Sequence, residues 1–284
     1  MYTIGIDSGS RMTKLCLFDI RHQQIVDCYK EETEENHEEL LNKIVSFILD
    51  KNKVEHATVK SIVCTGYGRK NYTKADRFTS EIICHAKGVN FLNKNIKTII
   101  DIGGQDSKII KLSDNGKVLD FVMNDKCAAG TGRFLEKVAQ ILKVDIADLS
   151  LRDCRDAACH ILSLRGTKII ERSGLGVSQS RKDIEISSTC VVFAESEIIG
   201  MINRGISKED IIRAVHKSIA HRVFGMSGNI GIEPPVSFVG GVALNKGMVS
   251  AFEENMDIDI FVPEMADMTG AIGAALVKGK DKVS

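Results

Sequence analysis

Two cysteines that directly precede segments with helical spacing are the residues best suited to redox chemistry. Cys127 stands before residues 128–136 and Cys190 before residues 191–203. Backbone N–H groups at a helix start lack partners within the helix, and together with the helix dipole they stabilise a thiolate. Two thiolates are too few for an iron–sulfur cluster, which usually takes four. Two copies of the chain would supply four, which suggests a cluster held between the subunits of a homodimer.

Three glycine-rich turns follow apolar strand patterns and could hold phosphate groups. In the first two, an aspartate (Asp7 or Asp101) stands two residues before a glycine, and residues 239–245 read Val-Gly-Gly-Val-Ala-Leu-Asn. N–H groups of such turns cradle phosphate oxygens, and the aspartate can hold Mg²⁺ through water. One turn of this kind could be an ordinary hairpin, but three together predict phosphate binding. The sequence contains neither GxxxxGK[ST] nor a complete GxGxxG, which excludes a P-loop and a dinucleotide fingerprint.

The spacing of apolar residues predicts the elements that position these groups. We expect strands in segments 2–10, 12–19, 98–107, 108–112, 117–123, 235–241 and 258–263, and helices at 37–50, 133–142, 191–203, 208–225 and 270–278. Because the strand–turn–strand unit occurs twice, we expect two related lobes. Residues 149–186, with a β-like run at 162–170, are expected to form an inserted hairpin or arm.

Composition excludes several classes of protein. The 284 residues include 38 basic and 38 acidic side chains, a net charge of +0, without a basic stripe, so no nucleic-acid partner is expected. No apolar run approaches the roughly 18 residues that span a bilayer, so no membrane partner is expected either. The N-terminus lacks the pattern of a secretory signal, so we expect a cytoplasmic protein with reduced cysteines. Cys16, Cys64 and Cys84 lie in apolar runs and are expected in the core.

The three turns resemble the two phosphate motifs and the adenosine motif of the actin, Hsp70 and sugar-kinase superfamily. The cysteine segments, KCAAGTGRFLE at 126–136 and CVVFAESE at 190–197, resemble those of the activators of 2-hydroxyacyl-CoA dehydratases. These activators belong to the BadF/BadG/BcrA/BcrD-type ATPase family, together with the ATP-binding subunits of benzoyl-CoA reductase. The resemblance covers nearly the whole chain. One departure is the longer stretch between the two cysteines, which leaves the identity of the partner open.

The resemblance implies an α/β, two-lobed actin-like (ribonuclease H-like) ATPase fold of mixed sheets flanked by helices. Lobe I would span residues 1–97, with the C-terminal helix 268–284 packed back on it. Lobe II would span residues 98–267 and would contain both cysteines, the adenosine turn and the insertion near 149–186.

The resemblance also assigns residues to the expected site. The first phosphate turn would consist of Asp7, Ser8, Gly9, Ser10, Thr13 and Lys14, and the second of Asp101, Gly103, Gly104, Gln105 and Asp106. Asp7 and Asp101 would hold Mg²⁺, and Gln105 or Asp101 would position the attacking water. The adenosine contacts would come from Gly240, Gly241, Val242 and Asn245, with Gly270 nearby. Cys127 and Cys190 would bind the cluster as its metal ligands.

The implied function is ATP-hydrolysis-driven transfer of one low-potential electron. The electron would come from ferredoxin or flavodoxin and pass through one 4Fe–4S cluster per homodimer to a partner iron–sulfur enzyme. That acceptor would be a 2-hydroxyacyl-CoA dehydratase or a related double-cluster reductase. Two alternatives stay open: a small-molecule kinase of the same superfamily, for which the sequence has no substrate signature, and a regulatory ATPase. Cys154, Cys159 and His160 could form a second metal site or merely pack within the insertion.

Overall fold

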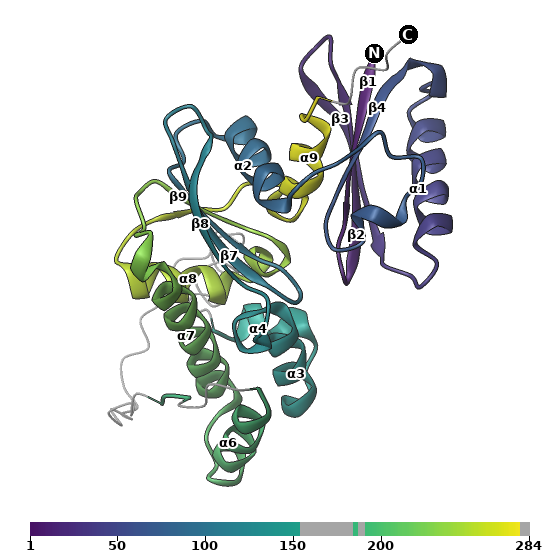
Figure 1. Ribbon diagram of the computed structural model, residues 1–284. Helices are drawn as coiled ribbons and strands as arrows, with labels where there is room; N and C mark the ends of the chain where they lie inside the picture. The colour runs from purple at the N-terminus through teal and green to yellow at the C-terminus, as the bar shows by residue number, and fades with distance from the viewer. Residues whose placement is uncertain (154–183, 187–190, 279–284) are drawn as a thin grey trace, which may run out of the picture.

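Two five-stranded mixed sheets form the framework of the protein (Figure 1). The computed structural model describes residues 1–153, 184–186 and 191–278. The first sheet has the order β3-β2-β1-β4-β5, with bounds Gln24–Glu32, Met12–Asp19, Tyr2–Ser8, Val59–Thr65 and Arg77–Phe78. The second has the order β10-β9-β6-β7-β8, with bounds Ile260–Phe261, Val236–Val239, Thr98–Ile102, Ser107–Leu112 and Val118–Asn124.

Both sheets repeat one arrangement around a central strand. β1 pairs antiparallel with β2 and parallel with β4, and β6 pairs antiparallel with β7 and parallel with β9. The two hairpins close at the pairs Ser8↔Thr13 and Ile102↔Ser107. The two glycine-rich turns therefore lie where the sequence predicts them, each between a central strand and its antiparallel neighbour.

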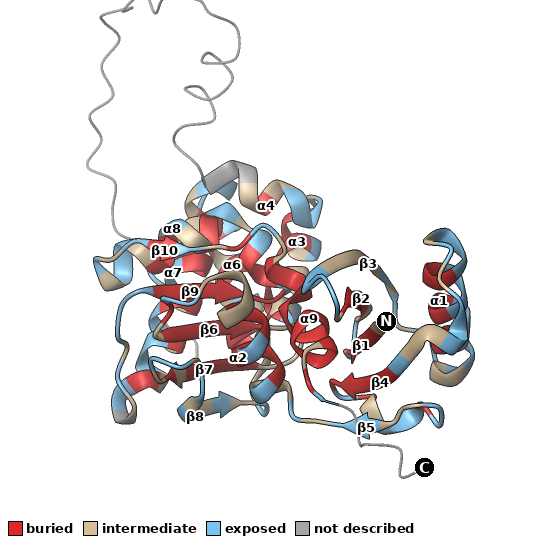
Figure 2. Ribbon diagram, turned by 90° about the horizontal axis from the view of Figure 1, so that it is seen from above, coloured by how far each residue is buried: buried red, intermediate tan, exposed pale blue. Residues whose placement is uncertain are grey.

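Two helices lie between the sheets, as Figure 2 shows for α9. α9 (Thr269–Ala275) packs on β1, β2 and β4 and against α2 (Glu81–Leu92). Helix α9 approaches β1 so closely that a Cβ at Gly5 would lie 2.0 Å from the Ala271 carbonyl oxygen. A Cβ at Gly273 would lie 1.7 Å from the Cys84 carbonyl oxygen. Because no side chain fits at either position, glycine is required there.

The remaining helices cover the outer faces of the sheets. α1 (His37–Lys51) packs on the first sheet, and its start is capped by Asn36, whose side chain accepts the Glu39 N–H at 3.3 Å. The larger core of the second sheet is built with five helices: α3 (Gly132–Leu142), α4 (Ile146–Asp153), α6 (Val191–Asn203), α7 (Lys208–Met226) and α8 (Lys246–Met256). None of the helices among the described residues is long and apolar enough to span a bilayer.

Most of the expected elements are present. Strands β3, β4 and β5 of the first sheet were not expected from the sequence, and several other elements differ from the prediction as well. The expected strand at 258–263 is reduced to β10, and the helix at 270–278 ends at Ala275. Helices α2 and α8 were not expected from the sequence. The prediction of a hairpin or arm that starts at residue 149 is wrong for its first residues, because Leu149 lies fully buried within helix α4. Residues 154–183, including Cys154, Cys159, His160 and the β-like run, lie outside the described residues.

The lobe boundaries at 97/98 and 267/268 stay a prediction. α9 lies against the first sheet. α2, which falls within the expected lobe I, packs its Ala86 and Val89 against Ile99 and Ile110 of the second sheet. α2 and α9 together thus join the two sheets.

Candidate functional site

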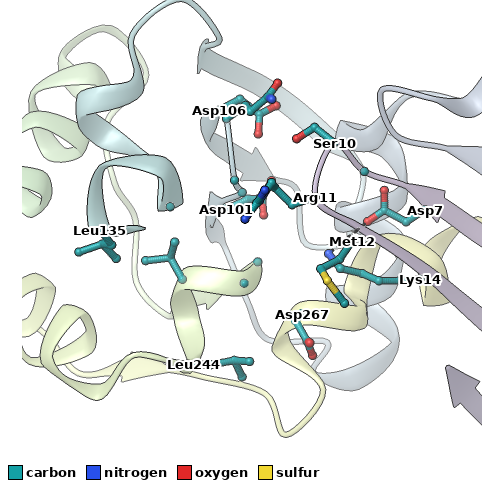
Figure 3. A pocket seen from close by; sticks show the side chains of 18 of the residues that line it. Asp7, Ser10, Arg11, Met12, Lys14, Asp101, Asp106, Leu135, Leu244 and Asp267 are labelled. Atoms are coloured by element: carbon teal, nitrogen blue, oxygen red, sulfur yellow. Dashed lines mark ion pairs between the residues drawn. The ribbon is translucent and has the colours of Figure 1, made fainter. Parts of the chain in front are cut away.

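A cavity of about 740 Å³ opens between the two sheets, and the three glycine-rich turns line it. Figure 3 shows Asp7 and Ser10 on one side, Asp101 and Asp106 on the other, and Leu135 and Leu244 toward a third, apolar wall. A cavity of this size holds a ligand as large as a nucleotide.

The first turn contributes four of its six predicted residues to the lining: Asp7, Gly9, Ser10 and Lys14. Ser8 and Thr13 are fully buried beside it. The Ser8 hydroxyl lies 3.2 Å from His37 Nδ1, and the Thr13 hydroxyl lies 3.0 Å from that of Thr33. These two side chains therefore stabilise the turn from the side that faces away from the cavity.

All five predicted residues of the second turn line the cavity. The turn is closed by the Gly103 N–H, which donates to the Asp106 carbonyl at 2.9 Å. Two of its carbonyls also accept hydrogen bonds from the start of α3: Gly132 N–H donates to Gly103 O at 2.9 Å and Arg133 N–H to Gly104 O at 3.0 Å. The second glycine-rich turn is therefore bonded directly to the helix that follows the Cys127 segment.

Each hairpin carries an aspartate and a lysine at paired positions beside its turn. Asp7 pairs in register with Lys14, and Asp101 with Lys108. Lys14 Nζ lies 3.6 Å from Asp7 Oδ2, and Lys108 Nζ lies 3.1 Å from Asp101 Oδ2. Lys108 was not predicted as a site residue, although the spacing of Asp7 and Lys14 is repeated by Asp101 and Lys108 in the second hairpin and could have indicated it.

Lys108 is the centre of a buried charge cluster. Its Nζ also lies 2.7 Å from an Asp106 oxygen and 2.9 Å from a Glu81 oxygen, and its side chain is only 3% exposed. Burial alone would lower the pKa of Lys108, but Asp101, Glu81 and Asp106 outweigh it, so its pKa is raised well above the ordinary value. The ammonium group is therefore charged at any physiological pH.

The carboxyl group of Asp101 faces a second buried base, His85 of α2. Burial would raise the pKa of Asp101, but the adjacent His85 and Lys108 outweigh it and hold that pKa below its usual value. His85 Nε2 lies 3.5 Å from Asp101 Oδ2, and its Nδ1 lies 2.9 Å from the Thr269 hydroxyl. Neither His85 nor Glu81 was predicted as a site residue, because helix α2, which contains both, was not expected from the sequence.

The third turn lines the other end of the cavity with Gly240, Gly241, Val242 and Asn245. Gly240 has φ +88°, and a Cβ there would lie 2.3 Å from the Ile102 carbonyl oxygen. Asn245 Oδ1 accepts the Met248 N–H at 3.1 Å, and Nδ2 lies 3.3 Å from Nε2 of buried His216. Gly270 is outside this lining, but a Cβ at that position would lie 2.8 Å from Asp7 Oδ2. The absence of a side chain at Gly270 therefore leaves room for the Asp7 carboxylate.

Cys127 lies away from the cavity lining, half-buried, at the start of the 3₁₀ helix Ala128–Gly130. Its N–H donates to Asn124 Oδ1 at 3.2 Å, and Arg222 Nη1 lies 3.9 Å from its sulfur. The expectation that α3 begins with unpartnered N–H groups near this thiol is wrong, because carbonyl groups of the second glycine-rich turn accept the N–H groups of Gly132 and Arg133. Cys190 lies outside the described residues, and α6 begins at the next residue.

No group of three or more His, Cys, Asp or Glu side chains within the described ranges is arranged to hold a metal ion by itself. A magnesium ion bound with a nucleotide takes much of its shell from phosphates and water. Asp7 and Asp101 could therefore assist such an ion without forming a complete protein cage.

A family model described as the BadF/BadG/BcrA/BcrD ATPase family matches residues 4–277. The chain belongs to this family. Over 277 residues it is 39% identical to the (R)-2-hydroxyglutaryl-CoA dehydratase activating ATPase of Acidaminococcus fermentans, covering 97% of this chain and 96% of the relative. Membership in the BadF/BadG/BcrA/BcrD family confirms the resemblance found in the sequence.

Solved structures confirm the fold. The activator of the 2-hydroxyisocaproyl-CoA dehydratase from Clostridium difficile, with bound ADPNP, matches with a TM-score of 0.81 and 39% identity, covering 97% of this chain and 93% of that one. A ROK family glucokinase from Streptomyces griseus, at 13% identity and a TM-score of 0.53, covers 97% of this chain and 98% of its own and shows the fold alone. This member of the BadF/BadG/BcrA/BcrD family has the expected actin-like α/β fold with two mixed sheets.

Proposed function

We propose that the protein is an ATP-hydrolysing activator that delivers single low-potential electrons to a partner iron–sulfur enzyme. The acceptor would be a 2-hydroxyacyl-CoA dehydratase or a related double-cluster reductase, and the donor ferredoxin or flavodoxin. The observation that carries the proposal is the pair of hydrogen bonds that the start of α3, two residues beyond the Cys127-capped 3₁₀ helix, donates to the second phosphate turn. A change at the phosphates can therefore reach the cysteine through covalent and hydrogen-bonded backbone alone.

The turns and their aspartates would handle the nucleotide. Backbone N–H groups of the two turns bind the phosphates, and Asp7 and Asp101 hold Mg²⁺ directly or through water. Gln105, which lines the cavity beside Asp101, or Asp101 itself, orients the attacking water. Val242 and Leu244 contribute an apolar wall for the base, and Asn245 is held in place by its bonds to α7 and α8.

The residues around Cys127 fit one half of a shared cluster site. The thiol is half-buried rather than enclosed, and Nη1 of the Arg222 guanidinium group lies 3.9 Å from its sulfur. Cys127 and Cys190 of two copies would supply the four ligands, and the bound 4Fe–4S cluster would supply one-electron chemistry. Raising one electron by about 300 mV corresponds to about five tenfold steps, near 7 kcal/mol, which explains why nucleotide hydrolysis would be needed.

The test is the iron and acid-labile sulfide content of protein purified without oxygen, measured with its mass in solution. We expect about four irons and four sulfides per homodimer. Cys127→Ala and Cys190→Ala should lose both. The control Cys28→Ala, which removes a half-buried thiol from β3 of the first sheet, should keep both the iron and the sulfide. Folded protein that hydrolyses ATP but takes up no iron on reconstitution would eliminate the electron-transfer proposal and favour a regulatory ATPase or a kinase.

A further inference from the structure

Helix α2 presents two polar side chains to the cavity from behind the second phosphate turn. Glu81 and His85 stand four residues apart and so lie on one face of the helix. Both line the cavity. Glu81 contacts Lys108 at 2.9 Å, and His85 lies 3.5 Å from Asp101. α2 therefore reaches the charged groups of the turn through two separate side chains.

The alternation of side chains between the two faces of a strand explains why these contacts form. Ile100 and Ile102 of β6 belong to the core shared with the outer helices, whereas Ile99 packs with α2. Because side chains alternate between the faces of a strand, Asp101 must face α2 as Ile99 does. The same alternation places Lys108 on the face of Ile110. The carboxylate of Asp101 thus points toward α2 at the edge of the cavity.

The two oxygens of the Asp101 carboxylate have different surroundings. Oδ2 is contacted by Lys108 Nζ at 3.1 Å and by His85 Nε2 at 3.5 Å. Oδ1 lies on the side of Gly240, where a Cβ would approach it to 2.7 Å. Two contacts on one oxygen fix the plane of the carboxylate and leave Oδ1 facing the third turn.

The ring of His85 is itself fixed on its far side. Only 5% of the residue is exposed. Its Nδ1 lies 2.9 Å from the hydroxyl of Thr269, the first residue of α9. A Cβ at Gly270 would lie 3.4 Å from the ring and 2.8 Å from Asp7 Oδ2. His85 therefore faces Asp101 with one ring nitrogen and is anchored through the other to the helix that packs on the first sheet.

We propose that His85 is a positioning residue that orients the Asp101 carboxylate for ATP hydrolysis. This inference rests on the ATPase part of the proposed function. In that reaction the water oxygen bonds to the γ-phosphorus, the bond to the β-phosphate oxygen breaks, and the released proton passes to phosphate or solvent. Because Asp101 would orient the water or the Mg²⁺, a displacement of about 1 Å in its carboxylate can lower the rate about 100-fold.

Two near-isosteric substitutions separate the contacts of the ring. The Nδ2 of asparagine stands close to the position of histidine Nδ1, and the Nε2 of glutamine close to that of Nε2. His85→Asn should keep the bond to Thr269 and lose the contact to Asp101, whereas His85→Gln should do the reverse. The control is Lys87→Asn, at an exposed position of the same helix. It also places an asparagine in α2, so it matches His85→Asn in the effect of the new residue on helix propensity.

The experiment measures kcat and KM for ATP hydrolysis, with thermal unfolding of each variant. His85→Asn should lower kcat about 100-fold while KM for ATP changes little, and His85→Gln and Lys87→Asn should keep most of the turnover. The inference is overturned if His85→Asn keeps full kcat, or if both His85 variants lose turnover equally and in step with their melting temperatures. Iron-free protein with this same kinetic pattern would overturn only the electron-transfer proposal. Unaltered protein that does not hydrolyse ATP would overturn both.

Discussion

Replacing Lys108 with methionine tests whether the buried charge cluster is a source of stability as well as a part of the site. The ammonium group lies within 3.1 Å of oxygens from Asp101, Asp106 and Glu81. Asp106 and Glu81 have side chains 14% and 19% exposed and keep some hydration, but that of Asp101 is only 3% exposed. Loss of one partner of a buried pair costs about 3–5 kcal/mol. Because two of the three carboxylates keep water, we expect about 3 kcal/mol.

The assay is urea unfolding at pH 7 and at lower pH. Asp101 has a lowered pKa in the folded protein, so its ionised form contributes stability above about pH 4, and this contribution is lost as pH falls through the folded pKa. Lys108→Met removes one of the groups that stabilise the ionised Asp101. The difference in free energy of unfolding between the unaltered protein and Lys108→Met should therefore become smaller in acid. Lys111→Met on the same strand, with a side chain 27% exposed and 3.4 Å from Glu233, should cost less than about 1 kcal/mol. A loss below about 1 kcal/mol in Lys108→Met, or a difference that widens in acid, would refute the reasoning.

Three further predictions concern the framework. Gly273→Ala should destabilise by about 3 kcal/mol in urea unfolding, because its Cβ would lie 1.7 Å from a backbone oxygen; Gly200→Ala, with nothing within 4 Å in α6, should instead be neutral or stabilising. Asn36→Ala should cost about 1 kcal/mol through loss of the α1 cap, and an unchanged urea midpoint would contradict this. Burial raises the pKa of Cys64 and Cys84 to about 12, so both should resist iodoacetamide at pH 8 until the protein unfolds, and their contribution to stability should decline as pH rises above about 8.5. Mass spectrometry of labelled peptides measures this, and rapid labelling of either thiol in folded protein would contradict it.

The hairpins and turns of the site could be predicted because their signals are local. Apolar strand patterns that end at Asp7 or Asp101 shortly before glycine define a strand and a turn without reference to the rest of the chain. The burial of Cys16 followed from its apolar neighbours in the same way, and it is fully buried. Family membership followed from the motifs, which are also local.

The parts that could not be predicted depend on contacts between distant segments. α2 was missed because it packs between a sheet and another helix, so apolar and small residues cover it on more than one side and no single apolar face marks it. The partners of Lys108 come from α2, β6 and the second turn, and one sequence does not show that they converge. The N–H groups at the start of α3 were predicted to lack partners, because the carbonyl groups that accept them, those of Gly103 and Gly104, stand about 30 residues earlier in the sequence.

The cavity is lined by segments that run from Asp7 to Asp267 and include both sheets, α2 and α3. A ligand that binds only when these segments are assembled stabilises the assembly as a whole, by about 2.7 kcal/mol when its concentration is a hundred times its dissociation constant. Nucleotide bound here would therefore act as a folding partner for the entire chain. A fall in its concentration would expose both halves together to unfolding and proteolysis, so that the lifetime of the protein in the cell would follow the energy supply on which its activity depends.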